Sequence, residues 1–392
     1  MTSHLMENYA APVVTFVKGN GTVLIDSEGN EYLDFLCGLS VTSLGHNRPE
    51  VTKAIQEQAA TLSHVSNLFD HPQRQAVASL INDLLVDAGG RSGKVFFCNS
   101  GAEANECALK LARKARPGKH VVLTTLNSFH GRTLATLAAT GQPEKQMVFA
   151  PMPEGFEHIA FGDLQAMEER LSVGDVAAVL VEVIQAEGGV NTPPIGYLPG
   201  LQEACRKVDA LFMIDEVQTG LGRTGQWFGF QDENLAPDVV TLAKALGNGI
   251  PVGACWALDG VAAAFKPGDH GSTFGGQPLA LAAAKATLET MIDLDAPALA
   301  HEASEQLRAG LLDLPGVTGV RGRGLILGAE LNADIAKEVT QEALAAGVVV
   351  NAVRPNVIRC MPPLTVSADE IHEALRRLHA AMTKVHEQAG GE

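Results

Sequence analysis

The chain has 392 residues and a mass of 41.2 kDa, a length that corresponds to two or three domains of ordinary size. Hydrophobic residues make up 46% of it and charged residues 19%, which is a globular composition and excludes a disordered polar chain. The formal net charge of -16 argues against a nucleic-acid-binding surface and against attachment to an anionic membrane.

Targeting and redox signals are absent from the sequence pattern. No uninterrupted apolar run reaches the ~18–20 residues that a membrane helix needs, and the opening MTSHLMENYAAPVV does not have the pattern of a secretory signal. The six cysteines are scattered and form no Cys-x-x-Cys pair, so neither a Cys-based zinc ribbon nor a dense disulfide scaffold is expected. We expect reduced, mostly buried thiols in a cytoplasmic protein.

The first half of the chain predicts strands that alternate with helices. Residues 22–36 predict two strands around a Gly-Asn turn, and two amphipathic helices are expected at about 49–61 and 72–88. The apolar strands that follow are KVFFCN (94–99), HVVLTT (120–125), VAAVLVEVI (176–184), LFMIDEV (211–217), VVTLA (239–243) and VGACWAL (252–258). Helices at 102–115 and near 199–207 lie between them. This alternation is typical of a mostly parallel α/β sheet covered by helices on both faces.

After about residue 288 the pattern changes. Long helices at 298–312, 334–346 and 367–387 are interleaved with the segments VTGVRGRGLILGAEL, VVVNAV and VIRCMP. We therefore expect a large α/β domain over 46–287 and a smaller C-terminal α+β domain over 288–392. Residues 1–45 are too few for a domain of this kind and are expected to contribute to the small domain and to the active site.

Two turns between strands and helices could bind a ligand. NSGAEANE (99–106) leads from a strand into a helix whose free N–H groups and dipole suit a phosphate, although an ordinary N-cap by Ser100 gives the same pattern. SFHGRT (128–133) follows a strand at the edge where open α/β sheets place ligands. Phe129 can offer a flat face to a heterocycle and Arg132 can pair with a carboxylate; a core phenylalanine and a surface arginine are the alternative.

Two ionisable residues interrupt apolar strands. Asp215 follows four apolar residues, and a buried carboxylate needs a partner, for which a structural ion pair is the simplest choice. Lys244 lies between an apolar strand and a glycine-rich loop, where desolvation lowers the pKa of an amine and frees it to attack carbonyls; a snorkelling lysine is the alternative. A phosphate cradle, an aromatic face, a buried acid and a buried amine are together the parts of a pyridoxal phosphate site.

Two other motifs do not have the context they would need. GLGRTG (220–225) matches Gly-x-Gly-x-x-Gly but does not lead into an apolar helix, so nicotinamide binding is not predicted. The sequence contains no His-Glu-x-x-His motif, and no metal site is expected.

At this point the chain resembles the class III pyridoxal-phosphate aminotransferases of fold type I, and within them the acetylornithine aminotransferase subgroup. The resemblance runs from YAAPVVTFVKGNG to VIRCMPPLTVS, and its strongest block is LFMIDEVQTGLGRTGQWFGFQDENLAPDVVTLAKALGNGIPVGA. The motifs NSGAEANE, NSFHGRT, IDEVQTGLGRTG and HGSTFGG fit the subgroup.

The resemblance implies that residues 46–287 bind pyridoxal 5'-phosphate. Lys244 would hold the cofactor as a Schiff base and act as the catalytic base, and Asp215 would pair with the pyridinium nitrogen. Gln218 would approach the phenolic oxygen, and Phe129 would stack on the ring. The phosphate contacts would come from Ser100, Gly101 and Ala102.

The resemblance also implies substrate contacts. Arg132 and Ser272 would contact the substrate, and Tyr9 would touch its carboxylate. Arg359 would bind the α-carboxylate of glutamate or 2-oxoglutarate. Glu187 would pair with Arg359 when the other substrate is bound, so that one site could accept both a terminal amine and an α-amine.

A shared dimer site and a reaction follow from the same resemblance. Thr273 would reach the phosphate of the neighbouring subunit's cofactor, which implies a homodimer with shared active sites. The implied reaction is ping-pong transfer of the δ-amino group of N2-acetyl-L-ornithine to 2-oxoglutarate, giving N-acetyl-L-glutamate 5-semialdehyde and L-glutamate in arginine biosynthesis. The alternatives are another class III ω-aminotransferase, acting on ornithine, succinylornithine, 4-aminobutyrate or a carrier-linked lysine, and a non-catalytic binding module.

Several positions differ from related patterns. The family usually has proline and glycine at Val183 and Ala186, and asparagine at Gln277. None of these replaces a catalytic group, but they bear on loop geometry and on the subunit contact. Ornithine δ-aminotransferases usually have tyrosine at Leu39 and tryptophan at His130, and both differences favour the acetylated substrate.

Overall fold

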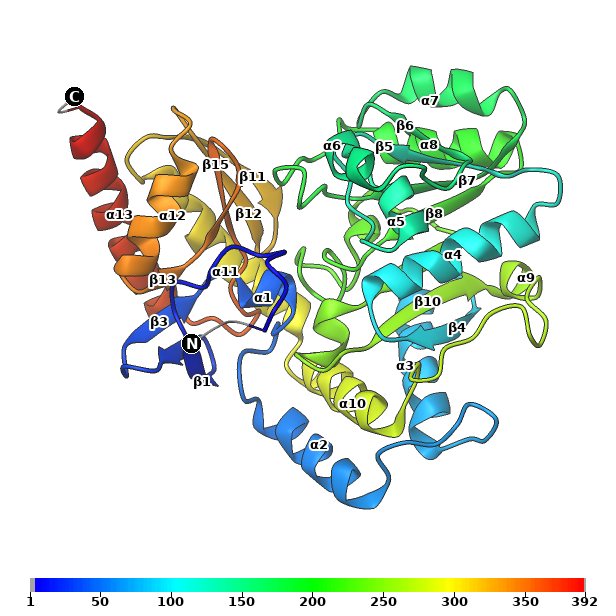
Figure 1. The fold of residues 1–392 in the computed structure, drawn as a ribbon, viewed down its shortest axis with the longest axis horizontal. Coiled ribbons are helices and arrows are strands. Elements are labelled where there is room, and N and C mark those ends of the chain that lie inside the picture. Colours follow the sequence, from blue (N-terminus) through cyan, green and yellow to red (C-terminus); the bar gives the residue numbers. More distant parts are fainter. Residues whose placement is uncertain (1–3, 391–392) are drawn as a thin grey trace.

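The computed structural model describes residues 4–390 and contains three sheets. The larger part, on the right in Figure 1, is built on a seven-stranded sheet. Its strands, in spatial order, are β4 (Gly93–Cys98), β10 (Gly253–Leu258), β9 (Val239–Leu242), β8 (Leu211–Asp215), β7 (Val176–Glu182), β5 (Val121–Thr125) and β6 (Phe156–Ile159). The pairs from β9 to β6 are all parallel, and β10 runs antiparallel to both β4 and β9. The predicted mostly parallel α/β sheet is therefore confirmed.

Both faces of this sheet are buried, which explains why its central strands are apolar almost without a break. In β8, Leu211 and Met213 belong to the cluster that includes Leu111 of helix α4 (Gly101–Ala115). The alternate residues Phe212 and Ile214 belong to the cluster on the other side, together with helix α8 (Tyr197–Lys207). The period of two in a strand thus assigns successive side chains to opposite faces.

The smaller part, on the left in Figure 1, contains two four-stranded sheets and the C-terminal helices. One sheet has the order β1 (Phe16–Asn20), β2 (Val23–Asp26), β3 (Glu31–Asp34) and β13 (Val348–Val349). The other has the order β11 (Val317–Arg323), β12 (Ile326–Leu331), β15 (Val357–Cys360) and β14 (Asn351–Arg354). Strands β3 and β13 are parallel, so the N-terminal segment pairs with a strand from the far end of the chain.

The remaining elements complete the layers and connections. The longer helices are α2 (Pro49–Thr61), α3 (Pro72–Gly89), α7 (Leu164–Leu171), α10 (Pro278–Asp293), α11 (Ala296–Leu312), α12 (Ala336–Ala345) and α13 (Ala368–Gly390). The short ones are α1 (Cys37–Ser40), α5 (Leu134–Ala139), α6 (Pro143–Gln146), α9 (Asp259–Ala262), η1 (Met147–Phe149), η2 (Gly229–Glu233) and η3 (Lys244–Gly247). No helix within residues 4–390 is long and apolar enough to cross a membrane. The six cysteines are free and buried.

Arg223 in the GLGRTG motif connects three parts of the chain. Its fully buried guanidinium donates to the backbone oxygens of Leu325 and Pro362 at 3.0 and 2.6 Å and to the hydroxyl of Ser43 at 3.0 Å. Burial lowers the pKa of Arg223 to about 10, because no carboxylate within the described chain pairs with it. The motif that resembles a dinucleotide loop therefore holds the large part against the N-terminal segment and the small part.

Candidate active site

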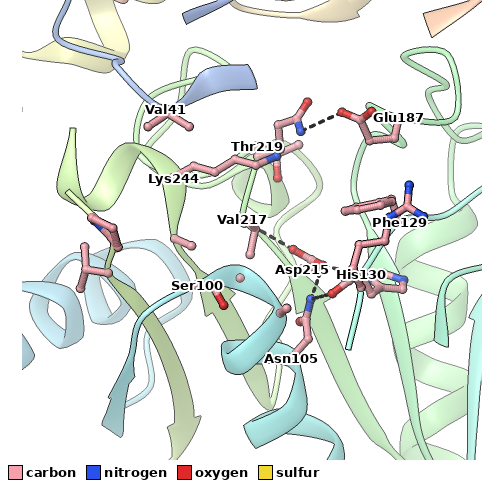
Figure 2. A pocket seen from close by; sticks show the side chains of 18 of the residues that line it. Val41, Ser100, Asn105, Phe129, His130, Glu187, Asp215, Val217, Thr219 and Lys244 are labelled. Carbon is pink, nitrogen blue, oxygen red and sulfur yellow. Dashed lines mark hydrogen bonds and ion pairs between the residues drawn. The ribbon is translucent and has the colours of Figure 1, made fainter. Parts of the chain in front are cut away.

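A cavity of about 420 Å³ lies at the carboxyl ends of the central strands, where open α/β sheets bind ligands. Figure 2 shows side chains from several elements pointing into it, with Val41 contributed by the N-terminal segment. Many of the residues predicted from the sequence line it: Ser100, Gly101, Ala102, Phe129, Arg132, Glu187, Asp215, Gln218 and Lys244. The lining does not include Tyr9, Ser272, Thr273 or Arg359.

Lys244 is the first residue of η3, two residues after the end of strand β9, with a positive φ of 44°. Desolvation lowers the pKa of its amine to about 8; Arg359 acts in the same direction, while Glu187 and Asp215 oppose the shift. Its amine has no hydrogen-bond or ion-pair partner within residues 4–390. A desolvated amine that loses its proton near neutral pH can attack a carbonyl carbon, so the structure favours a nucleophile over a snorkelling surface lysine.

Asp215 ends strand β8 and is fixed by a buried network (Figure 2). One carboxylate oxygen accepts the backbone N–H of Val217 at 3.0 Å. The other accepts the amide of Asn105 and pairs with Nδ1 of His130, both at 2.8 Å. Thr241 in turn donates to Asn105 at 2.8 Å. No arginine or lysine within the described chain pairs with Asp215, so the simple structural ion pair proposed above does not account for it.

Glu182 is a second buried acid that the sequence analysis did not identify. It ends strand β7 directly beside Asp215 in the parallel register, and both residues line the cavity. Its carboxyl oxygen accepts the backbone N–H of Phe129 at 3.1 Å. Burial and the neighbouring Asp215 raise the pKa of Glu182 well above its usual value. Glu182 therefore anchors the loop that carries the aromatic ring of Phe129.

The start of helix α4 has both an N-cap formed by Ser100 and free N–H groups that suit a phosphate. Ser100 caps the helix, because its hydroxyl accepts the N–H of Glu103 at 3.2 Å. The first helical backbone bond runs from the N–H of Ala104 to the oxygen of Ser100, so the N–H groups of Gly101 and Ala102 have no acceptor in the helix and remain available to an anion in the cavity. A Cβ on Gly101 would lie 2.8 Å from Cγ1 of Val217, so only glycine lets this helix start approach the loop after β8.

Arg359 lies on β15 behind the cavity wall and is fully buried. Its Nη1 donates to the carboxylate of Glu187 at 2.7 Å and to the side-chain oxygen of Gln218 at 3.0 Å. Its Nη2 is buried without a partner among the described residues. Burial by itself would raise the pKa of Glu187, but Arg359 and Lys244 outweigh it and lower that pKa. The structure therefore contains the predicted contact between Glu187 and Arg359.

Arg132 remains an uncompensated cation. Its guanidinium carbon lies 5.5 Å from the centre of the Phe129 ring, and its side chain has no hydrogen bond or ion pair with residues 4–390. Lys145 lies on the same ring, with its amine 5.8 Å from the centre. An unpaired guanidinium that lines a cavity is suited to binding a carboxylate.

The remaining predicted residues lie elsewhere. Tyr9 is 86% exposed. Ser272 lines a separate hollow and accepts the amide of Asn99 at 3.1 Å, so the predicted substrate contact is not seen within one chain. The backbone oxygen of Thr273 accepts the amide of Gln277 at 3.0 Å, and Gln277 also accepts the N–H of Val65 at 3.2 Å. The departure at Gln277 thus ties the segment that carries Thr273 to the preceding chain.

These observations test whether pyridoxal phosphate fits. A partnerless amine, free helix N–H groups, a buried fixed carboxylate and an aromatic face line one cavity of suitable volume. The amine suits an aldehyde carbon and the helix N–H groups suit a phosphate. The carboxylate suits a protonated ring nitrogen, and the aromatic face suits a flat heterocycle.

Comparisons with known proteins agree with this chemistry. Residues 5–382 match the family model of class-III aminotransferases. The acetylornithine aminotransferase of Corynebacterium efficiens is 44% identical over 387 residues, covering 97% of this chain and 96% of that protein. The corresponding enzyme of Streptomyces coelicolor is 45% identical over 391 residues, covering 99% and 96%.

Solved structures of aminotransferases have the same fold as this chain. The ornithine aminotransferase of Toxoplasma gondii has a TM-score of 0.92 at 35% identity, covering 98% of this chain and 94% of that one. A second structure of that enzyme is described with partial occupancy of PLP at its active site. The N-acetylornithine aminotransferase of Stenotrophomonas maltophilia has a TM-score of 0.84 at 36% identity, covering 96% and 98%.

Proposed function

This chain belongs to the class III aminotransferases, and we propose that it transfers the δ-amino group of N2-acetyl-L-ornithine to 2-oxoglutarate. The products are N-acetyl-L-glutamate 5-semialdehyde and L-glutamate, a step of arginine biosynthesis. The observation that carries the proposal is the pairing of Glu187 with the buried Arg359, beside an unpaired Arg132 in the same cavity. The names of the relatives at 44–45% identity support the choice of substrate.

The enzyme depends on pyridoxal 5'-phosphate, as class III aminotransferases do. When bound, the cofactor supplies a carbonyl carbon that takes up the amine and a ring that accepts electrons. Lys244 would hold that carbon and Asp215 the ring nitrogen, with Phe129 against the ring and Gln218 toward its oxygen. The amides of Gly101 and Ala102, next to Ser100, would bind the phosphate.

Lys244 also moves the proton in this proposal. Its Nζ takes the proton from the substrate carbon that bears the transferred amine, acting as a positioned general base. A pKa of about 8 suits this role, since an efficient base titrates close to the working pH. Asn105, His130 and the N–H of Val217 keep the Asp215 carboxylate oriented while charge shifts toward it.

Two carboxylate sites explain how one cavity could use two different amines. With Glu187 on Arg359, Arg132 is the arginine of the cavity lining that has no carboxylate partner within residues 4–390, and it would bind the carboxylate of acetylornithine so that the distant δ-amine reaches Lys244. With Glu187 displaced, Arg359 would take the α-carboxylate of glutamate and Arg132 the distal one. The unpartnered Nη2 of Arg359 supports this second state.

We further propose a homodimer in the cytoplasm, in which Thr273 serves the cofactor of the neighbouring subunit. Thr273 and Ser272 lie outside the lining of their own cavity, which supports a role across a subunit contact. We also propose that residues 1–45, 46–287 and 288–392 form an N-terminal segment, a large domain and a small domain. The pairing of β3 with β13 supports a contribution of the N-terminal segment to the small domain, and the second boundary falls inside helix α10. Light scattering at working concentration tests the dimer, and a monomer that retains full activity would contradict it.

The substrate is tested with half-reactions. The holoenzyme is mixed with acetylornithine, succinylornithine, ornithine or 4-aminobutyrate, and the loss of the cofactor's absorption band is followed. Acetylornithine should give the highest kcat/KM. Free ornithine is the second candidate, because the ornithine enzyme of Toxoplasma gondii has the higher TM-score, 0.92 against 0.84. A preference for ornithine would overturn the first choice.

A further inference from the structure

The turn that carries Glu187 is held from the opposite part of the molecule by two arginines. At its base, Gln185 and Asn191 exchange backbone hydrogen bonds of 3.0 and 3.1 Å, and residues 186–190 form the tip of the turn. Nε of Arg354 on β14 donates to the backbone oxygen of Gly188 at 2.7 Å. Nε of Arg321 on β11 donates to the backbone oxygen of Gly189 at 2.8 Å. The two residues that directly follow Glu187 are therefore both fixed.

The contact is closely fitted. Gly189 has a φ of +116°, and a Cβ there would lie 3.0 Å from Cγ of Arg354 and 3.2 Å from Nη2 of Arg321. A Cβ on Gly188 would lie 2.9 Å from the backbone oxygen of Asn127. Arg354 also donates to the side chain of Asn127 at 2.7 Å, just before the loop that carries Phe129. Glycine at 189 thus leaves room for the two arginines, and glycine at 188 leaves room for the backbone of Asn127.

Arg321 and Arg354, here called the clamp arginines, lie in the same sheet as Arg359, the arginine that pairs with Glu187. Strand β14 pairs with β15, which carries Arg359, and β11 belongs to the same sheet. Arg354 has no carboxylate partner within residues 4–390, and its guanidinium donates instead to the backbone oxygen of Gly188 and the side-chain oxygen of Asn127. The same sheet therefore supplies Arg359, which pairs with Glu187, and the two arginines that hold the turn carrying Glu187.

We propose that Arg321 and Arg354 are positioning residues that hold Glu187 on Arg359 and thereby set which substrate carboxylate the site accepts. This inference rests on the proposed exchange of Glu187 for an α-carboxylate. Admission of glutamate requires the Glu187 carboxylate to leave Arg359, and a turn held by both backbone contacts favours the side-chain position that reaches Arg359. Binding of acetylornithine at Arg132 requires that carboxylate to stay on Arg359.

The test compares the two half-reactions in Arg354→Ala, Arg354→Lys and Arg321→Ala. Arg323→Ala is the matched control, because Arg323 on β11 also reaches the large part, through Asp232 at 2.7 Å, but does not touch the turn. We expect the ratio of kcat/KM for acetylornithine to that for glutamate to fall about tenfold in both alanine variants, or about 1.4 kcal/mol. The ratio should fall less in Arg354→Lys, since a lysine amine can keep one of the two contacts of Arg354, and it should not change in the control.

A second readout needs no turnover. Glutarate has two carboxylates and no amine, and its binding to the holoenzyme is measured by calorimetry. We expect it to bind about tenfold tighter to Arg354→Ala than to the wild type, because Arg359 is then easier to free. A melting temperature for each variant verifies folding.

The outcomes separate the clamp from the function on which it rests. Equal loss in both half-reactions, or an unchanged ratio with unchanged glutarate affinity, would overturn the clamp. Failure of the wild type to use acetylornithine would instead overturn the proposed function, while the glutarate comparison would still decide whether the arginines hold the turn.

Discussion

Replacing Glu187 by glutamine removes one charge from the site and keeps the shape of the side chain. Arg359 is fully buried and the Glu187 side chain is 26% exposed, so water screens their attraction only in part. Breaking a buried ion pair costs about 3–5 kcal/mol, and a glutamine that still accepts the Arg359 N–H recovers part of this. We therefore expect a loss of about 1.5–3 kcal/mol, or about 10–100-fold, in the state that needs the pair.

The expected loss is unequal between the two half-reactions. Acetylornithine uses the closed pair, so its kcat/KM should fall by about this factor, whereas glutamate, which displaces Glu187, should lose little or gain. Stopped-flow spectroscopy of each half-reaction measures both values. Glu203→Gln is the control, because Glu203 forms a pair of similar geometry with Arg206 on the surface at 2.8 Å. Equal losses in both half-reactions would refute the reasoning.

The same variant has a second, independent effect. The charge of Glu187 opposes the desolvation that lowers the pKa of Lys244 to about 8. Its removal should lower that pKa further, so that the Lys244 amine loses its proton at a lower pH. The pH dependence of cofactor uptake by the apo-protein reports this directly. A midpoint that stays in place or moves upward would contradict the electrostatic account of the site.

Three further predictions concern Lys244, Glu216 and Asn105. Cofactor uptake by the apo-protein should rise with pH and level off above about pH 8, and Lys244→Ala should lose at least about a thousandfold in turnover; uptake that still rises toward pH 10.5 would contradict the lowered pKa. Burial raises the pKa of Glu216 to about 7 from 4.5, so the native state holds a proton that the unfolded chain releases and stability should fall by about 3 kcal/mol from pH 4.5 to 7. In urea unfolding, Glu216→Gln should lessen the fall in stability by about this amount, while the contribution of the buried Glu182 remains; an unchanged slope would count against the prediction. Asn105→Ala deletes a charge-assisted hydrogen bond to Asp215, and its cofactor affinity, measured by equilibrium dialysis, should fall about 10–100-fold; an unchanged affinity would argue against the network.

The sequence predicts those elements whose burial is uniform. Strands β7, β8 and β9 are buried on both faces, so their apolar runs are unambiguous. The reversed direction of β10 leaves no trace in composition, since an antiparallel strand in the same buried setting reads alike. Helix α10 does not follow from the sequence pattern, because it is buried over most of its circumference and its polar stripe is only the narrow row Lys285, Glu289 and Asp293. Strand β6 at the sheet edge is only half-buried and too short to show a period.

In the candidate site, too, some residues can be predicted from the local sequence pattern and others cannot. Lys244 and Asp215 stand out because each interrupts an apolar run. Glu182 interrupts β7 in the same way, and that signal could have been used. The partnership of Asn105 with Asp215 depends on how α4 packs across the sheet, and a contact between residues 110 positions apart cannot be deduced from local pattern. Tyr9 and Ser272 depended on resemblance alone.

The parallel pairing of β3 with β13 has a consequence for the synthesis of the protein. Leu33 pairs with Val348, so an N-terminal strand cannot find its partner until about 315 further residues have been translated. At about 5–20 residues per second, that strand must wait on the order of 15–60 seconds. Because Val41 follows this strand closely and lines the cavity, the catalytic pocket is completed only near the end of translation. We expect the ribosome-bound chain to be inactive until β13 has emerged and paired with β3.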